Sequence, residues 1–218
     1  MNTRKLLALA VLLILGLAFY FGMDAYRDRT QAEQDTRVAV EGSRLVRMHT
    51  PIIGPQNAPV TIVEFFDPAC ETCRAFYPVV KELMQQYPTE VRLVIRYAPF
   101  HQGSEQVVKL LESARRQDKY LAVLEAVLAA QPQWADHGTP NLELAYKAAE
   151  QAGLDMQRAR ADIAAPALDA VVLQDVQDLT ALKVEKTPTF FVNGRPLPSF
   201  GHKQLTDLVA QEVSKTKK

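Results

Sequence analysis

Two cysteines, Cys70 and Cys73, are the only cysteines in this chain of 218 residues, and two residues separate them. At a junction between a strand and a helix, a dithiol with this spacing closes to a disulfide and reopens with little backbone movement. The two thiols must pair with each other, with another molecule, or with a metal. Their spacing favours the first of these, a pair built for redox cycling.

The segments around the cysteines have the composition of a strand, a helix and a second strand. Residues 60–66 are β-branched and aromatic, as in a buried strand, and residues 91–97 alternate like another one. Between them, apolar residues at helical spacing over 73–87 predict a helix. Cys70 then lies at the helix N-terminus, which stabilises a thiolate, so we expect it to have the lower thiol pKa. Cys73, one turn further in, is expected to react second.

The remainder of the chain completes a recognisable order of elements. Residues 104–183 are almost entirely helix-favouring, with breaks that leave room for about four helices. A strand at 189–192, an Asn-Gly turn, a return strand from Arg195 and a helix beginning near His202 follow. This order predicts an α/β protein with the thioredoxin fold and an inserted helical subdomain, in one domain that spans residues 45–218.

An apolar, uncharged segment at residues 6–23 precedes this domain. Its 18 residues would form a helix about 27 Å long, close to the thickness of the bilayer core. We therefore interpret residues 1–23 as a membrane anchor, with a cleaved signal peptide as the alternative, and 24–44 as a polar spacer. Arg4 and Lys5 favour a cytoplasmic N-terminus. The expected location is the bacterial inner membrane, single-pass with the domain in the periplasm, or the soluble periplasm after cleavage.

Composition argues against several other classes of protein. The formal net charge is zero and no basic stripe is interleaved with aromatics, so nucleic acid is not an expected partner. Covalent haem is disfavoured because Arg74, not a histidine, follows Cys73. A zinc site needs more ligands than one cysteine pair and four scattered histidines, namely His49, His101, His137 and His202. We expect no metal and no cofactor.

Two motifs far apart in the chain resemble the DsbA-like thiol:disulfide oxidoreductases. The first is the strand sequence at 57–67 that leads into Cys70-Glu71-Thr72-Cys73, and the second is Thr-Pro-Thr-Phe-Phe-Val-Asn-Gly at 187–194. The likeness extends over about residues 45–215. It implies the thioredoxin fold and disulfide exchange with protein substrates.

The resemblance also assigns roles to individual residues. In that family the first cysteine is the nucleophile and the second resolves the mixed disulfide, which implies these roles for Cys70 and Cys73. The proline before the late strand is cis and faces the cysteines, which implies this place for Pro188, with Thr187 beside it. Glu64 matches a buried acid that relays protons to the resolving cysteine in many thioredoxin-fold enzymes. A carboxylate at the sheet margin is an equal alternative for Glu64.

The dipeptide between the cysteines, Glu71 and Thr72, departs from the family's strong oxidases, which carry proline and histidine there. An acidic side chain beside the Cys70 thiolate opposes its charge, so we expect a less oxidising pair than in those oxidases. Thr187 resembles the residue of the reducing or isomerising members. Both features favour reduction or isomerisation, although oxidation is the family's commonest exported activity.

The sequence thus predicts an extracytoplasmic, monomeric thiol:disulfide oxidoreductase. Its partners would be protein substrates with thiols or disulfides and a membrane redox protein that resets the dithiol. The alternative is a binding or scaffold protein in which a permanent Cys70–Cys73 disulfide supports a thioredoxin fold.

Overall fold

The computed structural model describes residues 22–23, 42–136 and 138–217. Five strands form one mixed sheet with the order β1-β3-β2-β4-β5. Strands β2 and β3 run parallel, and the other neighbouring pairs are antiparallel. The strands are β1 (Ile52–Ile53), β2 (Val60–Phe66), β3 (Val91–Tyr97), β4 (Thr189–Val192) and β5 (Arg195–Pro196).

Strand β2 lies in the middle of the sheet, where its β-branched and aromatic residues are buried on both faces. Glu64 is opposite Ile95 of β3 on one side and Phe190 of β4 on the other. The strand ends at Phe66, directly before the loop that carries Cys70. The central strand therefore determines where the dithiol lies.

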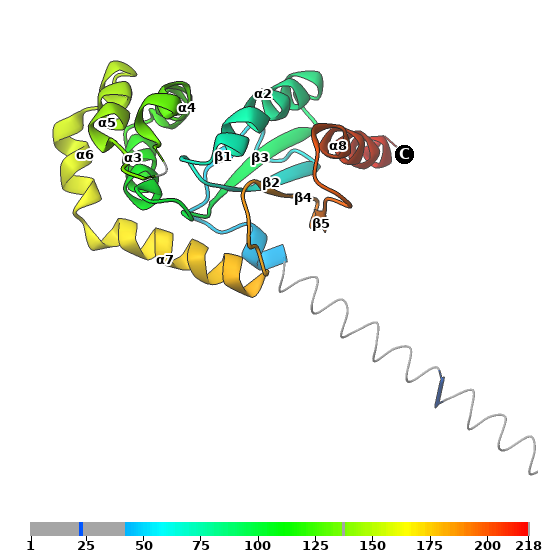
Figure 1. Cartoon of the computed structure of the whole chain (residues 1–218). Coiled ribbons are helices and arrows are strands. Elements are labelled where there is room, and N and C mark those ends of the chain that lie inside the picture. The colour runs from blue at the N-terminus through cyan, green and yellow to red at the C-terminus, as the bar shows by residue number, and fades with distance from the viewer. Residues whose placement is uncertain (1–21, 24–41, 137, 218) are drawn as a thin grey trace, which may run out of the picture. The chain divides into compact units, whose positions relative to one another are not determined.

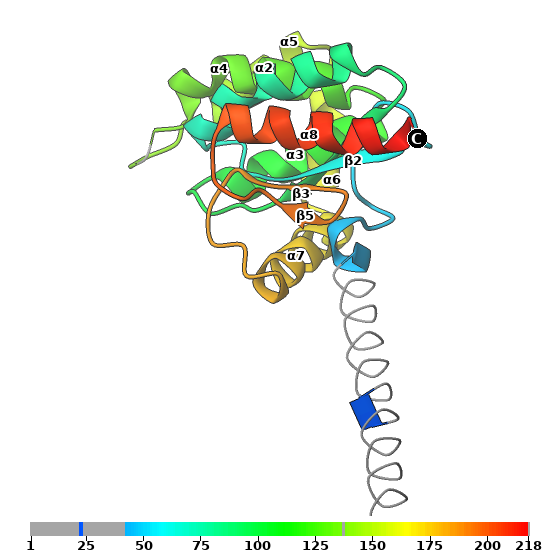
Figure 2. The same cartoon turned by 90° about the vertical axis from the view of Figure 1, so that its right-hand side faces the viewer.

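Helices cover both faces of the sheet (Figure 1). Helices α2 (Glu71–Gln86) and α8 (His202–Thr216) lie on one face, and α7 (Pro166–Ala181) lies on the opposite face, as the turned view in Figure 2 also shows. The first face has the larger core, in which Ile62 and Leu93 pack with residues of both helices. On the second face Val63 and Val94 pack with Leu179 of α7.

Four helices between β3 and α7 form the inserted subdomain: α3 (Ser104–Arg116), α4 (Tyr120–Trp134), α5 (Leu142–Gln151) and α6 (Met156–Ile163). The predicted helical stretch thus contains five helices instead of about four. The fifth, α7, packs on the sheet, where Leu179 contacts its core. The sequence pattern shows helical periodicity but not which layer a helix joins, so the insertion is shorter than predicted.

A buried network of charged side chains fastens α7 to the sheet. Arg96 of β3 is fully buried and donates hydrogen bonds to Asp175 at 2.7 Å and to Asp178 at 2.7 Å. Asp178 also accepts two hydrogen bonds from Arg47, at 2.6 and 2.8 Å. Both buried carboxylates of this network, Asp175 and Asp178, therefore face a guanidinium group.

The α/β architecture and the thioredoxin-like order of elements confirm the predicted fold class. The predicted membrane segment at residues 6–23 lies outside the described residues except for Gly22 and Met23, and most of the predicted spacer at 24–44 does too. In the part of the chain that the structure describes, no helix has the length and apolar character needed to cross a membrane.

Candidate active site

Cys70 and Cys73 lie at the start of α2, where the backbone turns out of the central strand. Cys70 is the N-cap residue of the helix, and its backbone N–H donates to the carbonyl of Asp67 at 3.1 Å. The first N–H groups of a helix have no partner within the helix and point toward its N-terminus. Cys70 is 7% exposed and Cys73 is fully buried, so the first sulfur is the more accessible one.

The two thiols have opposite pKa shifts. A hydrogen bond from the Cys73 thiol lowers the pKa of Cys70 to about 5, with help from Thr187 and from the backbone N–H groups of Thr72 and Cys73, although burial opposes the shift. Burial raises the pKa of Cys73 far above its ordinary value, and the hydrogen bond to Cys70 and the charge of Glu64 add to the effect. At neutral pH the pair therefore holds a thiolate at Cys70 and a thiol at Cys73.

The loop before β4 approaches the dithiol from the other end of the chain. The Thr187–Pro188 peptide bond is cis, the conformation that the family resemblance implies. The sulfur of Cys70 lies 3.4 Å from the carbonyl oxygen of Thr187, to which it donates when it is protonated. Pro188 is buried and Thr187 half-buried. The structure thus brings together four of the predicted site residues, Cys70, Cys73, Thr187 and Pro188.

Glu64 is the fifth predicted site residue, and it is buried in the middle of β2 with 2% of its surface exposed. Among the described residues, its Oε1 atom is the one buried side-chain oxygen or nitrogen that lacks a hydrogen-bond partner. Burial raises the pKa of Glu64 to about 8, and the negative charge of Cys70 contributes to this rise. Of the two readings, a buried acid near the thiols describes this position better than a carboxylate at the sheet margin.

Glu71 and Thr72, the two residues between the cysteines, form the first turn of α2 and are exposed. The negative charge of Glu71 does not prevent the pKa of Cys70 from falling to about 5. The dominant influences on that thiol are hydrogen bonds, which the sequence does not reveal.

Sequence reasoning missed Asp67, which organises the loop around the cysteines. Its backbone N–H lies 3.5 Å from the sulfur of Cys73 and donates to it. Its buried carboxylate accepts hydrogen bonds from the backbone of Ala69, Phe100 and His101 and from the side chains of His101 and Ser104. An Asp directly after a strand is a common turn residue, and this signal could have identified it. The imidazole of His101, one of the four scattered histidines, is a partner of this carboxylate.

Gln131 of α4 also escaped the sequence analysis. Its side-chain amide donates to the carbonyls of Pro68 at 2.8 Å and Cys70 at 3.0 Å, and its oxygen accepts from Nε of Arg74 at 2.8 Å. The inserted subdomain thereby holds the loop that carries Cys70. Gln131 lies 61 residues from Cys70, and no local pattern connects the two.

Across residues 22–23, 42–136 and 138–217, no three side chains of His, Cys, Asp or Glu gather where they could hold a metal ion. Near the dithiol, the carboxylate of Asp67 and the side-chain amide of Gln131 are engaged in hydrogen bonds with the backbone.

The fold and the pair of cysteines agree with a match to a known protein family. A family model described as Thioredoxin matches residues 47–210, which is more than half of the chain. The chain therefore belongs to the thioredoxin family, and its resemblance to the DsbA-like thiol:disulfide oxidoreductases is confirmed.

Individual relatives agree with this assignment. A thioredoxin-like oxidoreductase from Silicibacter pomeroyi DSS-3 is 30% identical, with a TM-score of 0.67 over 78% of this chain and 94% of that chain. Alpha-DsbA1 from Wolbachia pipientis shares the fold, with 18% identity and a TM-score of 0.70 over 80% of this chain and 96% of that chain.

A longer protein also contains a similar segment. The Na(+)/H(+) antiporter NhaA 3 of Salinispora tropica is 37% identical over 145 residues, which are 65% of this chain and 21% of the antiporter. The chain thus spans about a fifth of the length of the curated relatives it matches.

Proposed function

We propose that this protein is an extracytoplasmic oxidoreductase that exchanges disulfides with protein substrates through a mixed disulfide on Cys70, which Cys73 resolves. The observation that carries this proposal is the opposite direction of the two thiol pKa shifts, down to about 5 for Cys70 and upward for Cys73. A thiolate is the attacking species in disulfide exchange. At neutral pH Cys70 is therefore the sulfur that can attack a substrate, and Cys73 stays protonated until the second step.

In the reducing direction the reaction has two steps. The Cys70 thiolate attacks one sulfur of a substrate disulfide, the substrate S–S bond breaks, and the other substrate sulfur leaves as a thiolate that takes a proton from water. Cys73 then loses its proton and attacks the sulfur of Cys70, which expels the first substrate sulfur. The dithiol has become a disulfide and has transferred two electrons to the substrate. A membrane redox protein with its own dithiol would restore the reduced pair.

Glu64 is suited to take the proton from Cys73 in the second step. A base is needed there because burial raises the pKa of Cys73. The Cys70 thiolate contributes to the raised pKa of Glu64, about 8, and this thiolate disappears when Cys70 enters the mixed disulfide. The pKa of Glu64 should then fall, so that more carboxylate is present at the step that needs a base.

The proposed direction is reduction or isomerisation, as Glu71 and Thr187 suggest. Stabilising the thiolate favours the reduced form of a dithiol and makes its disulfide more oxidising. The pKa of Cys70, about 5, falls between the values of about 7 for thioredoxin and about 3.5 for DsbA. This supports an intermediate potential, below that of the strong oxidases.

The reduction potential of the Cys70–Cys73 pair, measured in glutathione redox buffers, tests both the chemistry and its direction. A value below about −200 mV supports a reductase or isomerase, and one above about −150 mV would identify an oxidase. A disulfide that resists reduction in every such buffer would overturn the proposal in favour of the scaffold protein.

In a parallel experiment, Cys73→Ser should accumulate mixed disulfides with substrate proteins, whereas the matched variant Cys70→Ser should not.

The proposed location, with the domain on the periplasmic side of the inner membrane, rests on the apolar sequence at residues 6–23. Alkaline extraction of membranes from cells that express the full chain tests it. The protein should remain with the membrane and become accessible to protease from the periplasm. Release into the soluble periplasmic fraction would indicate signal cleavage, and protection from protease would contradict the location.

We further propose that the protein acts as a monomer, which sedimentation of the full chain in detergent tests.

A further inference from the structure

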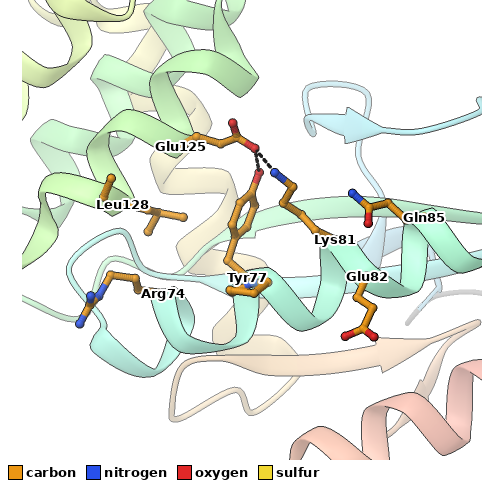
Figure 3. Close-up of a pocket in the computed structure, with 9 residues that line it drawn as sticks. Arg74, Tyr77, Lys81, Glu82, Gln85, Glu125 and Leu128 are labelled. Atoms are coloured by element: carbon orange, nitrogen blue, oxygen red, sulfur yellow. Dashed lines mark hydrogen bonds and ion pairs between the residues drawn. The ribbon is translucent and has the colours of Figure 1, made fainter.

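A groove lies between α2 and α4, and Arg74, one helical turn after Cys70, lies at one end of it (Figure 3). On α2 it is lined by Arg74, Tyr77, Lys81 and Gln85, which follow Cys70 at intervals of four, seven, eleven and fifteen positions. These intervals place side chains on one face of a helix. The groove therefore continues the face of α2 that carries Cys70. Its volume is about 610 Å³, which is enough for several side chains of a bound polypeptide.

The charges in the middle of the groove neutralise one another. Glu125 of α4 accepts hydrogen bonds from Lys81 at 2.7 Å and from the hydroxyl of Tyr77 at 3.0 Å (Figure 3). The hydrogen bond from Lys81 lowers the pKa of Glu125, as expected for a carboxylate that stays ionised beside a cation. Glu82 also lines the groove and points away from α4. The pair of Lys81 and Glu125 therefore adds no net charge to the middle of the groove.

Arg74 differs from these residues, because its guanidinium is held in place without being neutralised. Its Nε donates to the uncharged side-chain oxygen of Gln131 at 2.8 Å. No carboxylate in the described part of the chain forms an ion pair with Arg74, although Glu71 lies one helical turn before it. Arg74 is exposed, and its remaining donors form the planar fork that matches a carboxylate. A positive charge with fixed orientation thus lies one turn from Cys70.

We propose that Arg74 binds a carboxylate of the substrate polypeptide close to its reactive sulfur, so that the protein prefers cysteines with an acidic neighbour. This inference rests on the proposed function and adds a substrate class to it. The substrate segment enters the groove between α2 and α4 as its sulfur reaches Cys70. Gln131 serves as a positioning residue, because it anchors both the Arg74 side chain and the carbonyl of Cys70.

Peptide disulfides with a single change beside the cysteine test the preference. The reduced Cys73→Ser protein, in which Cys70 attacks the peptide disulfide and expels one peptide thiolate, is mixed with homodisulfides that carry Asp, Asn or Lys next to the cysteine. The measured quantity is the ratio of second-order rate constants for the Asp and Asn peptides. A change of protein folding or thiol reactivity alters both rates and cancels from the ratio.

We expect this ratio to be about fivefold higher with Arg74 than in Arg74→Gln, the size of one favourable ion pair near a surface. Arg74→Glu should reverse the order and favour the Lys peptide. The matched control is Arg160→Gln, which removes an exposed arginine of α6 that pairs with Glu143, and its ratio should equal that of the parent. Equal ratios in the parent and Arg74→Gln would overturn the proposal, and so would an equal decrease in Arg160→Gln.

A binding measurement keeps this proposal separate from the redox function. In the full chain with Cys70→Ser and Cys73→Ser, the NMR resonances of Arg74 Nε–H and the Gln131 side-chain amide should shift on adding an Asp peptide with serine in place of cysteine. The Asn peptide should leave them in place. If no peptide disulfide reacts but these shifts occur, the docking site stands and the oxidoreductase proposal fails. If the peptides react but neither resonance responds selectively, the docking site fails alone.

Discussion

Glu64 and Asp175 are both buried carboxyl groups, on opposite faces of the same sheet, yet their surroundings differ in almost every respect. Asp175 is fully buried and accepts hydrogen bonds from the Arg96 guanidinium at 2.7 and 3.0 Å and from the backbone of Tyr97 at 2.7 Å, and its Oδ1 lies 2.7 Å from Nε2 of His49. Glu64 has an oxygen without a partner. Both oxygens of Asp175 therefore have hydrogen-bond partners, whereas Oε1 of Glu64 has none.

This difference separates an acid that holds the fold from one that is available for chemistry. A carboxylate that is surrounded by donors stays ionised, and removing it leaves the donors stranded. A buried carboxyl group without partners stays protonated up to an unusually high pH, which is why the pKa of Glu64 rises to about 8. Such a group lowers stability and persists in a protein where its proton is used. The α7 face therefore stabilises the fold, and the α2 face contains the groups for which we propose the redox chemistry.

Removing the carboxylate of Asp175 should produce the largest effect. Asp175→Ala leaves the fully buried Arg96 guanidinium with one carboxylate fewer, and breaking a buried ion pair in this way costs about 3 to 5 kcal/mol. Urea unfolding of the reduced protein measures the loss. Asp169→Ala, on the exposed side of the same helix, is the control and should cost less than about 1 kcal/mol. The double variant Arg96→Met, Asp175→Ala should recover part of the stability. Similar losses for the two aspartates would contradict the structural role of Asp175.

Replacing Glu64 should have a smaller effect of opposite sign. Glu64→Leu removes an unpaired buried carboxyl group and should stabilise the reduced protein by about 1 to 3 kcal/mol at pH 4, where that group is neutral. The gain should depend on pH. The pKa of Glu64 is about 8 in the folded protein, and its ordinary value is 4.5. The free energy of unfolding of the parent is therefore highest below pH 4.5 and falls as the pH rises to about 8. Urea unfolding at pH 4, 6 and 8 should therefore show an advantage of the leucine variant that widens with pH.

An exposed glutamate provides the control for this prediction. Glu150→Leu changes the same side-chain type on the surface of α5, and its effect on the free energy of unfolding should be nearly the same at the three pH values. If Glu64→Leu also gave a constant difference, Glu64 would titrate at its ordinary pKa and would be unsuited to the proton transfer that we propose.

The sequence was sufficient to predict the elements of the α2 face of the sheet, but not the ion-pair network of the α7 face. The apolar pattern of residues 60–66, the helix after it and the spacing of Cys70 and Cys73 are local features, and each predicted its element and place. Strand β1, with only two residues in a proline-rich loop, is too short to produce a pattern. Long-range partners left no local trace, because Arg96 and Asp175 are 79 positions apart.

The same reasoning explains which site residues were missed. Glu64 was predicted because it interrupts an apolar strand shortly before the cysteines, where many thioredoxin-fold enzymes carry a buried acid. Gln131 lies in a helix whose sequence is typical of a core element, and its importance comes only from the carbonyls of Pro68 and Cys70 that it meets in the fold. Asp67 stands between these cases, since its turn position was visible but its five hydrogen bonds were not.

Arg47 allows a weaker perturbation of the stabilising face. Its side chain is 32% exposed and binds Asp178, which keeps a second partner in Arg96. Although burial opposes the shift, the hydrogen bonds from Arg47 and Arg96 lower the pKa of Asp178. Arg47→Met should therefore reduce stability by only about 1 kcal/mol at pH 7. The contribution of a carboxylate with a lowered pKa disappears as the pH falls below its ordinary value of 3.8, so the difference from the parent should shrink at pH 3. A difference that grows in acid would show that the pair is not formed.

The smallest expected effect concerns the pKa of Cys70 itself. Glu64 stays protonated until about pH 8, whereas Cys70 titrates at about 5. During the titration of Cys70 the carboxyl group is therefore neutral, and Glu64→Gln, which replaces it with an uncharged amide, should leave that pKa unchanged. The absorbance of the thiolate near 240 nm follows the titration, with Cys70→Ser as the blank. A fall in the pKa of Cys70 on Glu64→Gln would show that Glu64 is already ionised at pH 5. Glu64 would then resemble Asp175, and the contrast between the two faces of the sheet would not hold.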